Sequence, residues 1–413
     1  MRSWASVAIP PLQDTFPIPS LRIFDTAAQR ISEVEVKSIY RMYVCGITPY
    51  DATHLGHANT YLSFDLLHRY LLATGAKVNF VENITDIDDP LLERAKRDGV
   101  DWQDLATSQI DLFRADMVAL HILPPGHYIG AVDAIPLVVD AISVLEGVDS
   151  VYKVENDLYF KVHSDAKFGS RSHLPKNQML EIFAERGGDP DRAGKQDPLD
   201  ALLWLAQRPD EPGWDSKYGI GRPGWHIECC AIALNYLDID PAAATSIDFQ
   251  CGGSDLIFPH HEMSAAQSRL MNNKEFAAHY VHAGMIALDG EKMSKSKGNL
   301  VFVSQILSEG VDAMVIRAAL LRHHYRSDHL WHTSELDEAK LFLDELRLCL
   351  SRPEVAPTDK TIEAVIYSLS EDLNAPAALS ALQSWIAATN KGETGGNPGE
   401  LSRAIDALLG IAI

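Results

Sequence analysis

A strand, a glycine turn, a helix and a second strand are predicted in succession near the start of the chain. Met42 to Cys45 is a short apolar run that ends at Gly46, and residues 61–67 have the apolar spacing of a helix. Residues 77–84 show the alternation that is typical of a strand. Because a connecting helix brings two strands of one sheet into parallel alignment, the chain is predicted to adopt a doubly wound α/β fold. Ligands of such sheets bind beyond the carboxyl ends of the strands.

The rest of the pattern predicts more strands, an insertion and a helical end. Further strands are predicted at residues 201–205, 247–250 and 280–282. Residues 101–147 are mostly helical in pattern, and residues 151–154 and 158–162 are typical of a hairpin. From Val311 the pattern is helical again, with apolar residues three and four apart between Leu336 and Leu350. We expect five parts: an N-terminal extension (1–36), the first half of a Rossmann-type domain (37–150), an inserted connective region (151–220), the second half of that domain (221–310) and a helical bundle (311–413).

Composition and charge exclude several classes of protein. The chain has 413 residues, and 36 Lys and Arg against 57 Asp and Glu give a net charge of −21 without a long basic stripe, so no nucleic-acid partner is expected. No apolar stretch is long enough to cross a bilayer and no export signal is visible, so we expect a cytoplasmic protein without a membrane partner. Five scattered cysteines favour free thiols or metal ligation over disulfides.

Two short segments far apart in the sequence have the residue types that a reacting triphosphate needs. His54 and His57 flank Gly56 where a loop meets a helix, so both rings can lie near a helix N-terminus, where anions are favoured. Lys292 and Lys295 follow a turn signal, and their ammonium groups can reach the β- and γ-phosphates in the transition state. Either motif alone also fits a solvated polar loop. Together they predict attack of a carboxylate on the α-phosphate of ATP, with Mg²⁺ accompanying the nucleotide.

Cys45, Cys229 and His260 form a candidate metal-ligand set. Each lies at the end of a predicted strand or the start of a helix, and zinc binds two thiolates and an imidazole tetrahedrally. Three protein ligands leave one position open, where a cysteine substrate could form a Zn–S bond of about 2.3 Å that serine cannot imitate. The alternative from the residues alone is that Cys45 and Cys229 are buried free thiols.

At these motifs the chain resembles the class I aminoacyl-tRNA synthetases. Four segments are similar to the cysteinyl-tRNA synthetase signature, namely residues 43–46, 83–89, 221–229 and 258–262. The resemblance implies a Rossmann-type catalytic domain, ATP as a substrate, one zinc ion per chain and a monomeric protein. It also implies an adenylate pocket lined by Cys45, Gly46, Ile47, Thr48, Thr60, Asn83, Ile84, Thr85, Trp225, Gly253, Ser254, Asp255 and Ile286.

Three departures separate the chain from the tRNA enzymes. That family commonly has a glutamate four residues after the ligand histidine, where this chain has Ser264, and the chain ends without an anticodon-reading module. Residues 46–57, 88–94 and 185–190 resemble instead a branch of the family, the cysteine ligases of the actinobacterial mycothiol pathway. This resemblance implies a cysteinyl-adenylate that is passed to the amine of glucosaminyl-inositol, with release of AMP and pyrophosphate.

Two residues receive roles within this expectation. Asp255 is expected to be the general base for the incoming amine, although it could instead orient that amine. Arg186 lies in the segment 185–190, whose paired glycines allow movement, and is expected to close over the adenylate or the acceptor.

Three other functions are weighed against the ligase. A truncated cysteinyl-tRNA synthetase would share the adenylation step but would charge tRNA. A zinc-binding regulatory protein on an inactive synthetase fold is disfavoured by Lys292 and Lys295. A zinc hydrolase is disfavoured because the chain lacks paired helical histidines with an intervening glutamate.

Overall fold

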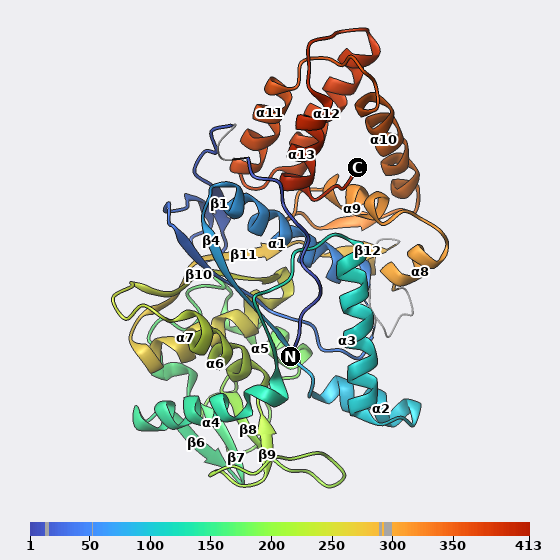
Figure 1. Ribbon diagram of the computed structural model, residues 1–413. Helices are drawn as coiled ribbons and strands as arrows, with labels where there is room; N and C mark the ends of the chain where they lie inside the picture. Colours follow the sequence, from blue (N-terminus) through green and yellow to red (C-terminus); the bar gives the residue numbers. More distant parts are fainter. Residues whose placement is uncertain (13–15, 52, 289–290, 293–299) are drawn as a thin grey trace.

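The computed structural model describes residues 1–12, 16–51, 53–288, 291–292 and 300–413. A five-stranded parallel sheet with the order β11-β10-β3-β4-β5 forms its centre (Figure 1). These strands are β3 (Ile39–Val44), β4 (Lys77–Ile84), β5 (His127–Gly130), β10 (Thr245–Gly253) and β11 (Glu275–Ala283). The predicted doubly wound α/β fold is therefore confirmed. Residues 101–147 are mostly helical, as predicted, although the short strand β5 within them was not predicted.

Helices cover both faces of this sheet. On one face α1 (Leu55–Ala73) connects β3 to β4, and it is buried along most of its length because the C-terminal helices pack on its other side. The opposite face is covered by α4 (Ala131–Gly147), α6 (Trp225–Leu237) and α7 (Glu262–Asn272), which pack against one another. Two further helices, α2 (Asp89–Asp98) and α3 (Trp102–Ala119), follow β4 in the chain and pack together (Figure 1).

A second, antiparallel sheet follows α4. It contains β6 (Val151–Val154), β7 (Asp157–Phe160), β8 (Ala201–Ala206) and β9 (Gly221–Pro223) in that order. The predicted hairpin is confirmed as β6 and β7, and the predicted strand at 201–205 is β8, which belongs to this sheet and not to the parallel one. The connection between β7 and β8 carries η1 (Val162–Ser164) and α5 (Lys176–Glu185). The boundaries of the five predicted parts stay a prediction.

Shorter elements connect the parallel sheet to the C-terminal bundle. A hairpin of β1 (Arg22–Asp25) and β2 (Arg30–Glu33) precedes β3, and η2 (Ser254–Leu256) and η3 (Ile257–His261) follow β10. After β11, the strands β12 (Ile286–Leu288), β13 (Glu291–Lys292) and β14 (His329–Trp331) form a small sheet in the order β13-β12-β14. α8 (Val303–Ser308) and α9 (Ala313–Leu321) lie between β13 and β14 in the chain.

The C-terminal part is helical, as predicted. It contains α10 (Ser334–Leu350), α11 (Asp359–Ser370), α12 (Ala375–Asn390) and α13 (Pro398–Leu409). A fully buried ion network ties it to the sheet domain, because Asp65 of α1 pairs with both Arg69 and Arg317. Arg317 also donates to the carbonyl oxygen of Leu409, at 2.7 Å. No helix among the described residues combines the length and the apolar character needed to cross a membrane.

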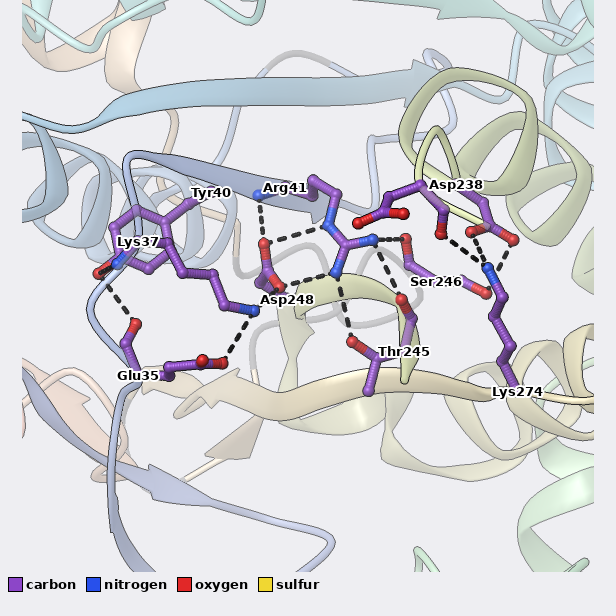
Figure 2. A network of polar contacts seen from close by, with 10 residues as sticks. Glu35, Lys37, Tyr40, Arg41, Asp238, Thr245, Ser246, Asp248 and Lys274 are labelled. Atoms are coloured by element: carbon purple, nitrogen blue, oxygen red, sulfur yellow. Dashed lines mark hydrogen bonds and ion pairs between the residues drawn. The ribbon is translucent and has the colours of Figure 1, made fainter. Parts of the chain in front are cut away.

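A polar network holds the amino ends of β3 and β10 in register (Figure 2). Asp248 accepts a hydrogen bond from the backbone N–H of Arg41, at 2.8 Å, and pairs with the Arg41 guanidinium, at 2.9 Å. Lys37 lies 2.9 Å from the same carboxylate. Although burial acts in the opposite direction, Arg41 and Lys37 hold the pKa of Asp248 below its ordinary value. This network therefore joins β3 and β10 at their amino ends, whereas the predicted site lies at their carboxyl ends.

Glu82 of β4 is a buried carboxyl group without a hydrogen-bond partner among the described residues. It pairs in register with Val44 and Tyr128 of the neighbouring strands, and neither of its oxygens makes a hydrogen bond with the described residues. Burial raises the pKa of Glu82 well above its ordinary value. The folded protein therefore keeps this carboxyl protonated under conditions in which the unfolded chain ionises it.

We expect Glu82→Gln to become progressively more stable than the wild type as the pH rises from 5 to 8. A raised pKa means that folding takes up a proton, so the wild type loses up to about 1.4 kcal/mol per pH unit until the pH passes the folded-state pKa. Glutamine does not titrate, and all other groups are shared. Urea unfolding of both proteins at several pH values measures the difference. The surface variant Glu393→Gln serves as control, and parallel curves for Glu82→Gln and the wild type would contradict the expectation.

Candidate active site

The carboxyl ends of the parallel strands bring most of the predicted site residues together. Because β11, β10, β3 and β4 are neighbours in the sheet, the residues that follow them lie along one edge. That edge holds Cys45, Gly46, Ile47 and Thr48 after β3, Asn83, Ile84 and Thr85 at the end of β4, Gly253, Ser254 and Asp255 at the end of β10, and Ile286 at the start of β12. Thr60 of α1 joins them, since a Cβ on Gly253 would stand 3.9 Å from Thr60 Oγ1.

Asn83 links the loops after β3 and β4. Its Oδ1 accepts hydrogen bonds from the backbone N–H of Gly46, at 2.9 Å, and from the Tyr43 hydroxyl, at 3.0 Å. Its amide donates to Thr85 Oγ1, at 3.2 Å. A Cβ on Gly46 would stand 1.6 Å from the Asn83 carbonyl oxygen, so only glycine fits there. The two loops are therefore held against each other by the backbone as well as by side chains.

The two histidines of the first motif stack at the start of α1. His54 is the N-cap, and its ring centroid lies 3.7 Å from that of His57. A Cβ on Gly56 would stand 2.9 Å from His54 Cε1, so the absence of a side chain at position 56 leaves room for the His54 ring. Burial and the neighbouring His54 lower the pKa of His57 well below its ordinary value, so this ring is neutral near pH 7. The predicted placement at a helix N-terminus is confirmed, and the role of these rings toward ATP stays a prediction.

The lysine motif is described only in part. The backbone of Lys292 belongs to β13 and pairs with Ala287, whereas Lys295 lies outside the described residues. The segment that follows, Val301 to Val303, lies beside the first motif. Leu55 N–H donates to the Val301 carbonyl, at 2.9 Å, and Val303 N–H donates to the Thr53 carbonyl, at 3.0 Å. The segments that flank the two motifs are thus bonded to each other.

The three predicted metal donors lie together near the carboxyl end of β3. One ligand atom from each of Cys45, Cys229 and His260 lies within 4.8 Å of the others, and all three residues are buried. Cys45 follows β3, Cys229 lies near the start of α6, and His260 lies in η3. Three elements that are distant in sequence therefore converge on one point that could hold a cation.

The pKa values of the two thiols in this group are shifted in opposite directions. Burial and the neighbouring Cys229 raise the pKa of the Cys45 thiol well above its ordinary value. Burial acts in the same direction on Cys229, but contacts with Cys45 and His260 hold the pKa of Cys229 well below its ordinary value. The protein itself thus favours the ionised form of Cys229. A bound divalent cation would favour ionisation of Cys45 as well.

His260 is oriented as a metal ligand. Its Nε2 is buried and has no hydrogen-bond partner among the described residues, while its Nδ1 lies 3.0 Å from Nδ1 of His226. Trp225, the first residue of α6, stacks on the same ring with 4.5 Å between centroids. A proton on Nδ1 that is shared with His226 leaves the Nε2 lone pair free for a metal ion. The donor set and this unpartnered nitrogen fit the predicted zinc.

Two further histidines, which were not assigned a role from the sequence, lie beside this group: His261 contacts Cys45, and His282 contacts His261. His261 Nε2 lies 3.2 Å from Cys45 Sγ and 2.8 Å from Gln250 Nε2. Its Nδ1 lies 2.8 Å from His282 Nε2, and His282 Nδ1 lies 2.8 Å from Thr26 Oγ1. Burial lowers the pKa of His261 well below its ordinary value and that of His282 to about 3. These neutral rings form an outer shell around the thiol.

Ser264 does not join the metal donors. Its hydroxyl donates to the carbonyl oxygen of His226, at 3.3 Å. Within the described part of the chain, the group at Cys45 contains no fourth histidine, cysteine or carboxylate donor. This arrangement is the one expected if one coordination position is left for a substrate.

Arg186 binds the backbone beside the site. It is the C-cap residue of α5, and its guanidinium donates to the carbonyl oxygens of Asp255 and Phe258. These carbonyls belong to the segment of η2 and η3 that connects Gly253 to His260. Arg186 therefore positions that segment, and the prediction that it closes over a ligand stays a prediction.

Comparisons with known proteins give a consistent result. The family model of the class I (C) tRNA synthetase catalytic domain matches residues 30–341. The chain is 51% identical over 417 residues to the L-cysteine:1D-myo-inositol 2-amino-2-deoxy-alpha-D-glucopyranoside ligase of Streptomyces coelicolor, and 50% identical over 420 residues to the ligase of the same name from Thermomonospora curvata. Both matches cover 100% of each chain.

The fold also resembles that of a solved synthetase. Mycobacterium tuberculosis methionyl-tRNA synthetase in complex with methionyl-adenylate superposes with a TM-score of 0.62 at 16% sequence identity. The match covers 91% of this chain and 89% of that protein. At this identity the likeness concerns the fold alone.

Proposed function

Since the chain belongs to the family of L-cysteine:1D-myo-inositol 2-amino-2-deoxy-alpha-D-glucopyranoside ligases, within the class I (C) tRNA synthetase family, we propose that it joins L-cysteine to the amino group of glucosaminyl-inositol in an ATP-dependent reaction. The observation that carries the proposal is full-length identity of about half the residues, together with a buried donor group of two thiols and an imidazole beside the predicted nucleotide site. The substrates are small molecules, and the predicted monomeric state stays a prediction.

In the first half-reaction, the cysteine carboxylate attacks the α-phosphate of ATP and the bond to pyrophosphate breaks. His54 and His57 at the start of α1 offer imidazole N–H groups to the phosphate oxygens. Lys292 and Lys295 are proposed to neutralise the leaving pyrophosphate, with Mg²⁺ on the nucleotide. Gly253, at the end of β10, is proposed to let the backbone approach the nucleotide.

Cysteine is proposed to be selected at Cys45, Cys229 and His260. A zinc ion bound by these three residues would supply a soft Lewis acid to which the substrate thiolate binds, and serine offers no comparable ligand. The chain's own contribution is orientation. His226 fixes the tautomer of His260, Trp225 packs on the ring of His260, and His261 contacts the Cys45 sulfur.

In the second half-reaction, the amine nitrogen of the acceptor attacks the acyl carbon and AMP leaves. The amine must be neutral to attack, and we propose that Asp255 accepts its proton. The Asp255→Asn variant is expected to slow amide formation by about 100-fold or more, because general-base catalysis typically contributes about 100- to 10,000-fold. It is also expected to leave cysteine-dependent ATP–pyrophosphate exchange nearly unchanged. Single-turnover transfer from preformed adenylate, measured against pH, checks this, and an unchanged rate and profile would remove Asp255 from the role.

The Arg186→Ala variant tests the positioning of the η2 and η3 segment. Loss of its hydrogen bonds to two carbonyl oxygens costs about 1–3 kcal/mol, which corresponds to about 5- to 160-fold in rate. We expect both half-reactions to slow, since the segment carries Asp255 and leads to His260. Arg186→Lys should recover part of the rate, and Arg97→Ala, in an exposed ion pair, serves as control. Normal rates in both half-reactions would contradict the positioning role.

The acceptor separates the ligase from a truncated tRNA enzyme. AMP release is measured from ATP and cysteine with glucosaminyl-inositol or with tRNA supplied separately. We expect AMP release with the amino sugar and none above background with tRNA. AMP release that depends on tRNA alone would overturn the proposed acceptor, although not the adenylation step.

All five cysteines are free, which fits the proposed cytoplasmic location.

A further inference from the structure

We propose that His323, His329 and Glu335 form a second metal site, which takes a divalent transition-metal ion such as Zn²⁺ or Ni²⁺ and is separate from the group at Cys45. One ligand atom from each of the three residues lies within 4.8 Å of the others. The proposal concerns binding and holds whether or not the proposed function is correct.

Three elements supply the donors. His323 lies in the turn after α9, His329 begins β14, and Glu335 lies at the start of α10. His323 Nε2 lies 2.7 Å from Glu335 Oε2, and the rings of His323 and His329 are stacked with 3.9 Å between centroids and 8° between planes. Two imidazoles and one carboxylate thus lie within a few ångströms of one another where the bundle meets the small sheet.

Of the three donors, His329 is the one whose polar atoms lack well-aligned partners. Both of its ring nitrogens are shielded from solvent and neither makes a well-aligned hydrogen bond with a described residue, although the nearby Ser327 backbone acts to raise the pKa of the ring against the lowering effect of burial. Leaving a buried polar group unpaired costs about 1–3 kcal/mol. A hydrophobic ring would stack on His323 equally well without that cost. A metal ion that accepts the lone pair of one ring nitrogen would remove that nitrogen's share of the penalty.

The donor types select the class of ion. Imidazole nitrogen with one carboxylate oxygen suits Zn²⁺, Ni²⁺ and related transition metals, whereas Mg²⁺ and Ca²⁺ prefer oxygen ligands. The carboxylate is already oriented, because Glu335 Oε1 accepts the His332 backbone N–H at 3.0 Å. The nitrogen lone pairs lie in the planes of the two imidazole rings, so the stacked rings of His323 and His329 cannot both point them at one ion. The two rings must first rotate apart. Rotation about χ2 of His323 or His329 provides that opening.

The position of the site gives binding a structural consequence. His329 pairs with Ile286 of β12, and β12 pairs in turn with β13, which contains Lys292. α10 packs against α9. An ion held by these donors would therefore clamp α9, β14 and α10 together beside the strand that leads to the lysine motif.

Calorimetric titration of zinc-loaded protein with Ni²⁺ tests the proposal. We expect one further ion to bind per chain, without a thiolate-to-nickel charge-transfer band, since the site has no sulfur donor. The His329→Phe variant keeps the stacked ring and removes both nitrogens. It should bind Ni²⁺ at least about tenfold more weakly, since even an outer-shell partner is worth about 10- to 100-fold. His163→Gln is the matched control, because His163 pairs with a single carboxylate, Asp197, at 2.9 Å.

Thermal unfolding supplies an independent readout. Ni²⁺ should raise the melting temperature of the wild type and of His163→Gln, but not that of His329→Phe. If His329→Phe does not fold, Glu335→Gln gives the same comparison. Three results would overturn the proposal: no further Ni²⁺ bound by the zinc-loaded wild type, binding that is accompanied by a thiolate band, or unchanged affinity in the folded variants.

Discussion

Replacement of Cys229 by alanine is expected to abolish metal binding and cysteine activation together. The group at Cys45 has three donors within the described residues, so the loss of one thiolate leaves two. It also removes the thiol whose pKa is held well below its ordinary value by Cys45 and His260, despite burial. We expect cysteine-dependent ATP–pyrophosphate exchange to fall by more than about 100-fold, beyond the 10- to 100-fold typical of outer-shell losses.

Metal content and exchange are measured on the same preparations of this variant. Cys349→Ala is the matched control, because Cys349 is also a buried free cysteine but lies in α10 of the bundle. It should keep its metal and its rate. The wild type should discriminate against serine, because serine has no soft ligand to offer. A Cys229→Ala protein that keeps a full complement of metal and exchanges normally would refute the proposed cysteine-recognition site.

The sequence predicted the parts of the site that follow from strand order. Cys45 and Asn83 end neighbouring predicted strands, and a helix at His54 connects them, so their closeness follows from the parallel crossover rule. The predicted donors Cys229 and His260 could be proposed from chemistry and resemblance. Their convergence on Cys45 depended on the packing of α6 and η3, which the structure provides.

Contacts between distant residues could not be predicted in the same way. His282 supports His261, and His226 supports His260, through hydrogen-bond distances that no local spacing encodes. β5 was missed because it has only four residues and lies between two helices, so it leaves no alternating pattern. Arg186 was expected over a ligand, but its contacts with two backbone carbonyls depend on how α5 packs beside η3.

Replacement of Asp65 by alanine is expected to produce the largest loss of stability. Asp65 is fully buried in α1 and pairs with Arg69, at 2.8 Å, and with Arg317 of α9. Although burial acts in the opposite direction, these two guanidinium groups lower the pKa of Asp65 to about 2. Alanine would leave two buried cations without a counter-charge, which costs about 3–5 kcal/mol when one partner of a buried pair is removed.

The same network explains why the effect should reach the bundle. Arg69 donates to the Asp406 carbonyl and Arg317 to the Leu409 carbonyl, both at 2.7 Å, so the two guanidinium groups hold the end of α13 against α1. Burial lowers the pKa of Arg317 to about 10 even with Asp65 present, which shows how strongly this position opposes a charge. Without Asp65, the arginines gain by leaving the interior, and α13 loses its attachment.

Urea unfolding near pH 7 measures the loss for Asp65→Ala, and proteolysis of the folded protein should become faster in the bundle. The pH dependence has a defined sign. A folded-state pKa of about 2, below the ordinary value of 3.8, means that the stabilisation is present above pH 3.8 and is lost as the pH falls through 2. Asp344→Ala, which breaks an exposed pair with Lys340, should change stability by less than about 1 kcal/mol. A loss for Asp65→Ala no larger than that of Asp344→Ala would mean that the arginines find other partners and that the bundle does not depend on this carboxylate.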